Sequence, residues 1–339
     1  MPTTSFGHLP DGAAIAEVRL ATRSGASASI ITFGASVRDL IVPLRGGGAR
    51  RVVLGYSNLD GYLTNPAYLG ATVGRHASRI AGGRLPIAGA LHQLTLNDGG
   101  HHLHGGAIGF SHRPWRILAA DESAVALALV SCDGDQGYPG TLEARCVYRL
   151  VDPATLRVVM TASTDALTVV NFAHHSYFTL TPGQPIRNHR LMIDAAHYVP
   201  FDSALIPTGE IRSVAGTPYD FRSLRSIEDA AGGSFFYDAC FVLNRSQDDL
   251  FRAAVLQAPD DKLMMEVHTT EPCLVFYDAA KLAPDPPGLD GKPHLPHAGP
   301  CLEPIKFPDS ANHPWFQQAL LRPGELYRQV TEYRFRTDL

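Results

Sequence analysis

The chain has 339 residues, of which 45% are hydrophobic and 18% charged, and its formal net charge is −4. This apolar content is enough for a sizeable core and excludes a disordered chain. The low charge excludes a typical nucleic-acid-binding protein, which carries a basic stripe. The sequence has neither an apolar run long enough to span a membrane nor the pattern of a secretory signal. We therefore expect a cytoplasmic protein.

Short runs rich in β-branched and aromatic residues, separated by turns among 31 glycines and 25 prolines, predict many strands. The predicted strands include residues 28–33, 125–131, 143–150, 156–163, 264–269 and 273–277. Helical signal is confined to residues 57–64 and 223–231, and residues 280–299 read as a long surface loop. We expect an all-β sandwich or barrel formed by one domain over residues 1–339.

The cysteines are five in number, and no two have the CxxC spacing of a metal site. We expect all of them to be reduced. They are Cys132, Cys146, Cys240, Cys273 and Cys301.

The first segment with potential chemistry, residues 74–80, places two arginines four positions apart among small residues. Arg75 can direct its guanidinium donors at a sugar hydroxyl or a carboxylate. An ordinary structural ion pair explains the same residues.

Residues 101–106 read His-His-Leu-His-Gly-Gly. In an extended strand His102 and His104 would share one face, which is also the spacing of the metal ligands in cupin-like barrels. A histidine whose ring nitrogens are hydrogen-bonded within a loop explains the pattern equally well. Gly105 and Gly106 let the backbone bend or approach a ligand closely.

Residues 171–178 contain two adjacent histidines after an apolar run. Neighbouring side chains alternate faces in a strand, so we expect only one of His174 and His175 to face a cleft. Histidine suits general acid catalysis near neutral pH because its unperturbed pKa is about 6.5.

Two carboxylates stand in settings that suit sugar chemistry. Asp238 lies among aromatic residues, where a carboxylate can accept hydroxyl hydrogen bonds while a ring covers the apolar face of a sugar. A turn or capping role is the alternative. Glu303 follows an apolar residue after the proline-rich loop, and burial there would raise its pKa and make it a better base. An ion pair with an arginine is the alternative for Glu303.

Taken in order, these motifs resemble the galactose mutarotase (aldose 1-epimerase) family. The resemblance covers the chain from about residue 34 to residue 335. It rests on Gly-Arg-x-Ala-x-Arg-Ile at 74–80, Leu-His-Gly-Gly at 103–106, His-Ser-Tyr-Phe at 175–178, Tyr-Asp at 237–238, Cys-Leu-Glu-Pro at 301–304, Phe-Pro-Asp at 307–309 and Leu-Arg-Pro-Gly-Glu at 321–325.

The resemblance implies a large antiparallel β-sandwich, called a supersandwich, with few short helices and an open cleft. It implies that the chain interconverts the α- and β-anomers of a free aldose without a metal or cofactor. The family's base corresponds to Glu303 and its acid to His175, and substrate-binding positions correspond to Arg75, His104 and Asp238. The expected partner is a small sugar, with no nucleic acid and no membrane, and the chain is expected to be a monomer or a homodimer.

The reaction itself suits one base and one acid. A proton leaves the anomeric hydroxyl, another reaches the ring oxygen, and the ring opens to an aldehyde that closes on its other face. We expect Glu303 to be ionised and His175 protonated at the start, because a nearby carboxylate favours a charged histidine.

The sequence departs from the family's usual motifs at four positions near these residues. His174, Ser78, Thr179 and Ile305 stand where the family commonly has Asn, Asn, Asn and Gln. These changes spare the acid and the base but alter their surroundings. The hypothesis that follows is that the preferred aldose is not galactose.

Three rival functions stay open at this point. A glycoside hydrolase would use Asp238 and Glu303 as its two carboxyl groups. A non-catalytic sugar-binding protein would share the fold without the proton transfers. A metal-dependent cupin-like enzyme would use His102 and His104.

Overall fold

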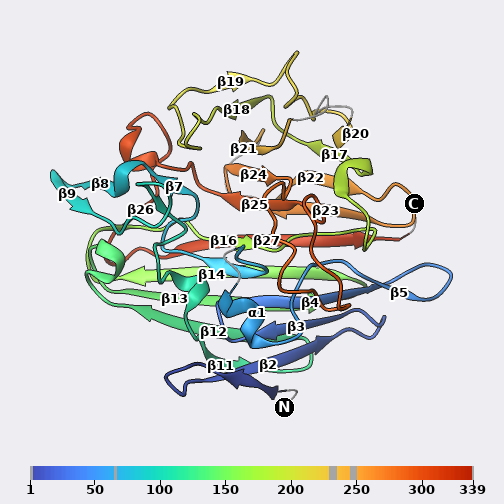
Figure 1. The fold of residues 1–339 in the computed structure, drawn as a ribbon. Coiled ribbons are helices and arrows are strands. Elements are labelled where there is room, and N and C mark those ends of the chain that lie inside the picture. The colour runs from blue at the N-terminus through green and yellow to red at the C-terminus, as the bar shows by residue number, and fades with distance from the viewer. Residues whose placement is uncertain (1–2, 65–66, 229–234, 245–249, 338–339) are drawn as a thin grey trace.

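Alternating apolar and polar residues form the long strands of the molecule. In β13 (Leu142–Val151) the buried side chains are every second residue, among them Cys146 and Tyr148, which is the pattern of a strand with one face in the core. The computed structural model describes residues 3–337 except 65–66, 229–234 and 245–249. Most elements of the described residues are strands, as the composition predicts (Figure 1).

The largest sheet has nine strands, and its long strands pair antiparallel. In spatial order they are β11 (Arg116–Ala120), β12 (Ala124–Ser131), β13, β14 (Thr155–Thr164), β27 (Tyr327–Arg336), β23 (Met264–Thr269), β22 (Phe251–Gln257), β17 (Arg190–Ile193) and β20 (Arg225–Ser226).

Two further sheets have five strands each among the described residues, and their neighbouring strands pair antiparallel. The first consists of β1 (Thr3–His8), β2 (Ala14–Ala21), β3 (Ser27–Ile31), β4 (Ser36–Pro43) and β5 (Ala49–Arg51). The second consists of β19 (Arg212–Ser213), β18 (His197–Val199), β21 (Asp238–Val242), β24 (Cys273–Tyr277) and β25 (Cys301–Ile305).

Short elements connect these sheets. The two-stranded pairs are β10 (His102–Leu103) with β7 (Arg79–Ile80), β15 (Thr168–Val169) with β26 (Leu320–Leu321), β16 (Ala173–His175) with β6 (Ala71–Val73), and β8 (Arg84–Ile87) with β9 (Ala90–Gln93). The helical elements are α1 (Leu59–Thr64) and the 3-10 turns η1 (Ala81–Gly83), η2 (Phe110–His112), η3 (Asp135–Gly137), η4 (Ile186–Asn188) and η5 (Ser310–Asn312).

One apolar core joins the three large sheets. Its buried side chains include Val37 of β4, Tyr148 of β13 and Phe276 of β24. Figure 1 shows β18, β21 and β24 at the top of the view and β2 and β3 at the bottom, with β14 and β27 between them. The expected β-sandwich is therefore confirmed. Because this core is continuous, we propose that the chain folds as a single domain.

The predictions for the helices and the cysteines have different outcomes. Helix α1 confirms the expected helix at 57–64. The second expected helix, at 223–231, lies partly outside the described residues, and within them Arg225 and Ser226 form strand β20. All five cysteines are free, as expected. Among the described residues no helix is long and apolar enough to cross a membrane.

The segment 280–299 is a loop between β24 and β25, as predicted, but it is not wholly a surface loop. Leu282 and His294 are buried, and the Leu289 amide donates a hydrogen bond to the Gly55 carbonyl. The loop therefore packs back onto the body of the protein, and its first residues are held beside the end of β24.

Candidate active site

A cavity of about 210 Å³ brings together residues from all five sequence segments that were singled out for their possible chemistry. It lies against one face of the sheet that contains β21, β24 and β25, since its lining residues alternate along β24 and β25, and the loop after β24 adds Lys281 and Leu282 to its wall. We call it the catalytic cavity. The polar residues that matter for its chemistry are Ser78, Arg79, His104, His175, Asp238 and Glu303.

Glu303 comes from the middle of β25, the edge strand of its sheet. All five residues of β25 are buried, and Glu303 pairs with Val275 of β24. The backbone around the carboxylate is thus fixed by ladder hydrogen bonds. Its position is rigid, which a base acting on one hydroxyl requires.

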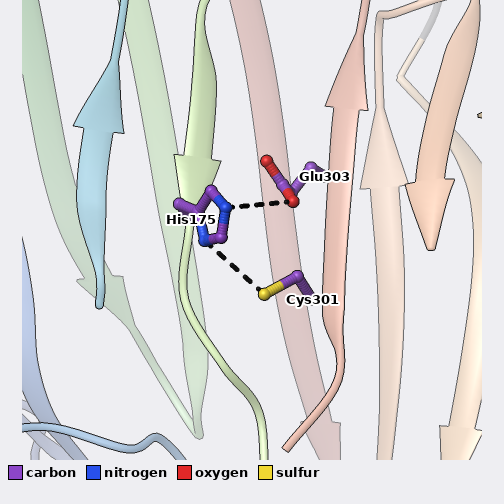
Figure 2. A group of neighbouring side chains, drawn as sticks. All are labelled: His175, Cys301 and Glu303. Carbon is purple, nitrogen blue, oxygen red and sulfur yellow. Dashed lines mark hydrogen bonds and ion pairs between the residues drawn. The ribbon is translucent and has the colours of Figure 1, made fainter. Parts of the chain in front are cut away.

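His175 ends β16, which packs against β25. Tyr177, two residues later, forms a β-bridge with Cys301, and the Phe178 amide donates to the Pro300 carbonyl. These bonds place His175 opposite Glu303. Their facing atoms, His175 Nε2 and Glu303 Oε1, are 3.6 Å apart (Figure 2).

The neighbouring His174 faces away from this pair, as strand alternation predicts. Its ring nitrogens lie within hydrogen-bond distance of the Tyr148 hydroxyl, at 3.3 Å, and the Ser176 hydroxyl, at 2.8 Å. His174 therefore belongs to a buried polar network on the other side of β16. Only His175 of the two reaches the cavity.

Cys301 supports the second nitrogen of His175. Its Sγ lies 3.5 Å from His175 Nδ1 (Figure 2). Burial raises the pKa of the Cys301 thiol well above its ordinary value, so the sulfur stays protonated and can donate to Nδ1. The thiol can donate to Nδ1 when that nitrogen is unprotonated and accept from it when it carries the proton, so the contact holds the ring in either tautomer.

Burial sets the charge states of the pair. It lowers the pKa of His175 to about 4. It also raises the pKa of Glu303 well above its ordinary value, and the negative charge of Asp238 raises it further. Desolvating two charges outweighs their attraction across 3.6 Å. Both pKa shifts therefore run against the expectation of an ionised Glu303 and a protonated His175, and favour the form of the pair in which Glu303 carries the proton.

His104 lies beside the pair as a neutral donor. The Ser78 backbone amide donates to His104 Nδ1 at 3.2 Å, which leaves the ring proton on Nε2. Burial lowers the pKa of His104 well below its ordinary value, and the nearby His175 lowers it further. The ring of Tyr68 completes this wall. Its centroid lies 4.8 Å from that of His104 and 5.7 Å from that of His175.

Asp238 lines the opposite side, at the first residue of β21. Burial raises the pKa of this carboxyl above its ordinary value. Among the described residues no hydrogen bond to its side chain is found within the protein, so its oxygens remain available to sugar hydroxyls.

Arg75 is the one predicted site residue that the structure does not bring to the cavity. Its side chain is buried and donates to Ser131 Oγ and to the carbonyl groups of Ser131, Cys132 and Pro139. Arg79, four residues later, lines the cavity and forms an ion pair with Asp98 at 2.6 Å. The structure therefore places Arg79, and not Arg75, in the wall of the cavity, because the bend at residues 75–78 turns the two side chains in different directions.

The pairing of His102 with His104 also fails. His102 is fully buried, with Nδ1 2.7 Å from the Thr95 carbonyl and Nε2 2.7 Å from the Tyr138 hydroxyl. Both of its nitrogens are thus occupied. His104 adopts a left-handed backbone with φ 52°, so the two rings leave the chain on different sides. This geometry excludes the cupin-like arrangement.

Gly105 serves packing here. At this position, with φ 87°, a Cβ atom would lie 1.7 Å from the Gly74 carbonyl oxygen, so only glycine fits. The glycine thereby holds the segment of His104 against the segment of Arg75. The sequence suggested that the backbone here approaches a ligand closely. In the structure the backbone of Gly105 instead approaches the backbone of Gly74.

A cluster of three possible metal ligands does exist within the described residues, formed by His175, Cys301 and Glu303. Glu303 faces Nε2 of the ring and Cys301 faces Nδ1 (Figure 2). One ion can bind only one nitrogen of a ring, whereas Glu303 and Cys301 each face a different nitrogen of His175. The arrangement therefore suits proton transfer better than metal binding.

Sequence reasoning missed Tyr68, Tyr177 and Lys281 as cavity residues. Tyr68 and Lys281 lie outside the motifs that the sequence singled out, whereas Tyr177 lies in the motif at 175–178 but was given no role. Of the unusual positions, Ser78 and Ile305 line the cavity, whereas His174 and Thr179 are buried elsewhere.

Comparisons with known proteins agree with this geometry. A family model described as aldose 1-epimerase matches residues 16–334. The chain is 37% identical over 335 residues to the aldose 1-epimerase of Escherichia coli, covering 96% of each. It is 38% identical over 338 residues to the galactose mutarotase of Mus musculus, covering 98% of this chain and 97% of the relative.

A solved structure of an aldose epimerase homologue from C. elegans superimposes with a TM-score of 0.90 at 26% identity, covering 95% of this chain and 98% of that one. The chain belongs to the aldose 1-epimerase family.

Proposed function

We propose that this isomerase interconverts the α- and β-anomers of a free aldose, with Glu303 and His175 moving the protons. The observation that carries the proposal is the facing pair, 3.6 Å apart and buried at the base of the catalytic cavity. A carboxyl and an imidazole at this spacing can reach two oxygens on one anomeric carbon.

The proton transfers balance within the pair. Carboxylate Glu303 takes the proton of the anomeric hydroxyl while imidazolium His175 gives its proton to the ring oxygen. The bond from C1 to the ring oxygen breaks, and the sugar becomes an open aldehyde. Rotation about the bond from C1 to C2 presents the other face, and both transfers then reverse. Nothing is consumed, and the enzyme returns to its starting state.

The charge states of the pair fit this cycle. When the ring opens, Glu303 becomes protonated and His175 becomes neutral, which is the state that burial favours. Burial therefore stabilises the protonation state that accompanies the aldehyde. One proton shared between the two residues supports both halves of the reaction.

The polar residues that line the catalytic cavity retain the open-chain form of the sugar. Arg79 and the Nε2 proton of His104 can donate hydrogen bonds to sugar hydroxyls, and Asp238 can accept them. Holding the hydroxyls keeps C1 beside the pair until the ring closes.

The first prediction concerns the pair. Glu303→Gln and His175→Asn should each lower kcat by about a hundredfold to ten-thousandfold, because each removes a general acid–base group. The measurement is polarimetry of freshly dissolved α-glucose and α-galactose, corrected for the uncatalysed rate. Wild-type rates in both variants would refute the assignment.

Matched controls are available at exposed positions. Glu143→Gln on β13 and His8→Asn on β1 make the same chemical changes outside the cavity. Both should retain wild-type rates. Circular dichroism and thermal unfolding separate a loss of chemistry from a loss of fold.

A second prediction follows from the pKa directions. The active pair holds one proton. Below the lowered pKa of His175, about 4, a second proton binds and no base remains. Above the raised pKa of Glu303 the single proton is lost and no acid remains. The profile of kcat/KM should therefore be bell-shaped, with its acid limb near pH 4 and its alkaline limb at the raised pKa of Glu303.

An acid limb centred at the ordinary histidine value would contradict this charge assignment. Circular dichroism at each pH serves as the control for unfolding. The uncatalysed reaction is subtracted at every point because protons and hydroxide also open the ring.

A third prediction separates the two arginines. Arg79→Met should raise KM about tenfold or more, since a hydrogen bond to a charged group is worth roughly 1.5–3 kcal/mol. Its unfolding midpoint should change little. Arg75→Met should do the reverse, because it removes the hydrogen bonds to the carbonyl groups of Ser131, Cys132 and Pro139, at a cost on the order of 3 kcal/mol.

Arg51→Met is the control, since Arg51 also forms an ion pair, with Asp39 at 2.8 Å, but lies outside the catalytic cavity. It should leave KM unchanged. A KM effect of Arg75→Met larger than that of Arg79→Met would reinstate the original assignment.

A fourth prediction concerns the sugar. Ser78 and Ile305 line the cavity and offer fewer hydrogen-bonding groups than the Asn and Gln common in the family. We predict that galactose is not the fastest substrate among galactose, glucose, xylose, arabinose and fucose. The double variant Ser78→Asn, Ile305→Gln should shift the preference toward galactose. A clear galactose preference of the wild-type protein would count against the hypothesis.

Two rivals remain to be separated by assay. A glycoside hydrolase using Asp238 and Glu303 would release reducing sugar from an aryl glycoside. A non-catalytic sugar-binding protein would bind sugars without changing the decay of optical rotation. A cytoplasmic location and the choice between monomer and homodimer stay predictions.

A further inference from the structure

Tyr68 enters the catalytic cavity from a backbone conformation that side chains of its size rarely adopt. Its backbone is left-handed, with φ 57°, which is an outlier for a bulky residue. Such conformations persist only where the surrounding contacts enforce them, and they cluster at functional sites. The side chain is half-buried and lines the cavity, so it is not simply a core residue. The conformation of Tyr68 therefore indicates a role in the site in addition to packing.

The turn that carries Tyr68 is bonded directly to the backbone of His175. The Gly70 amide donates to the His175 carbonyl at 2.9 Å, and the Val37 amide donates to the Gly70 carbonyl at 2.9 Å. At residue 70, where φ is 69°, a Cβ atom would lie 2.0 Å from the Val37 carbonyl oxygen, so only glycine fits. The Ala71 amide closes the turn on the Tyr68 carbonyl. These contacts fix the place of Tyr68 relative to His175.

The ring of Tyr68 packs among three imidazoles. Its centroid lies 4.8 Å from that of His104, 5.5 Å from that of His112 and 5.7 Å from that of His175. His112 is itself held by Ser111, whose hydroxyl lies 2.9 Å from His112 Nδ1. The phenol ring is thus fixed by its neighbours, and it covers part of the imidazole of His175.

The cover matters because burial is the main cause of the lowered pKa of His175, which is about 4. The side chain of His175 is only 5% exposed. Without the ring of Tyr68, the space beside it would be lined by imidazoles, and a space of this kind admits water when it is polar and large enough. Hydration of His175 would raise its pKa toward the ordinary value.

The other titratable groups that face His175 do not favour its charged form strongly enough to offset burial. They are Glu303 and Cys301 from β25, His104 from the segment after β10, and His174 and Tyr177 from the segment of His175 itself. Strand β6, which pairs with β16, consists of Ala, Thr and Val and brings none. Burial raises the pKa values of Glu303 and Cys301 and lowers that of His104, so each of these three also tends toward its neutral form.

We propose that Tyr68 is a positioning residue of the reaction, whose ring keeps water from the imidazole of His175 and thereby sets the charge state of the acid. The role belongs to the ring and not to the hydroxyl, since it is the ring that contacts His175. This inference rests on the proposed anomerase function, because the charge state of His175 is read out through the reaction.

The test follows the acid limb of the kcat/KM profile for glucose and galactose, by polarimetry corrected for the uncatalysed rate. Tyr68→Gly removes the ring at a backbone angle that glycine adopts without strain, and Tyr68→Ala is a second variant without the ring. In both, the acid limb should rise from near pH 4 by about one pH unit or more, because hydration favours the charged form of His175. Tyr68→Phe keeps the ring and should keep the acid limb of the wild type.

Phe251→Ala is the matched control, since it removes a ring that packs against the core outside the catalytic cavity, and it should leave the acid limb in place. Circular dichroism at each pH identifies the folded variants. An unchanged acid limb in folded Tyr68→Gly or Tyr68→Ala would overturn the role of Tyr68 while leaving the reaction intact. An equal rise in Tyr68→Phe or in Phe251→Ala would overturn it too. A wild-type protein inactive on all the aldoses tested would instead refute the proposed function.

Discussion

The burial of two ionisable side chains against each other is the constraint on which the site depends. Glu303 and His175 face each other at 3.6 Å with almost no exposure. Burying charges is costly, so burial lowers the pKa of His175 and raises the pKa of Glu303, which favours the neutral form of the pair. A reaction that needs one base and one acid in alternation can use such a pair in both directions.

The fold maintains this arrangement by fixing the backbone on both sides. Strand β25 carries Glu303 and Cys301, and β16 carries His175, while the bridge between Tyr177 and Cys301 ties the two segments together. The thiol of Cys301 holds the far nitrogen of the ring. The same sheet then continues from β25 through β24 and β21 to β18, so Glu303 and Asp238 are carried by one hydrogen-bonded ladder.

The roles of the arginines and histidines show where local sequence misleads. Arg75 and Arg79 lie in one motif, yet the first satisfies buried carbonyl groups and the second reaches the cavity. His102 and His104 have strand spacing, yet the left-handed backbone of His104 turns its ring away from the ring of His102. Side-chain direction in a bent segment depends on backbone angles, and these depend on distant neighbours such as Gly74 against Gly105.

The sequence by itself determined the strand-rich fold and the buried strands, because alternation and turn residues are local signals, and its motifs pointed to Glu303 and His175 as the pair that we propose to be catalytic. It also determined that one of two adjacent histidines faces the cleft. Only the tertiary structure decided which arginine lines the cavity, that Tyr68 and Lys281 join it, and in which direction burial shifts the pKa values of the pair. Those outcomes depend on burial and on contacts between segments far apart in the chain, which no local pattern encodes.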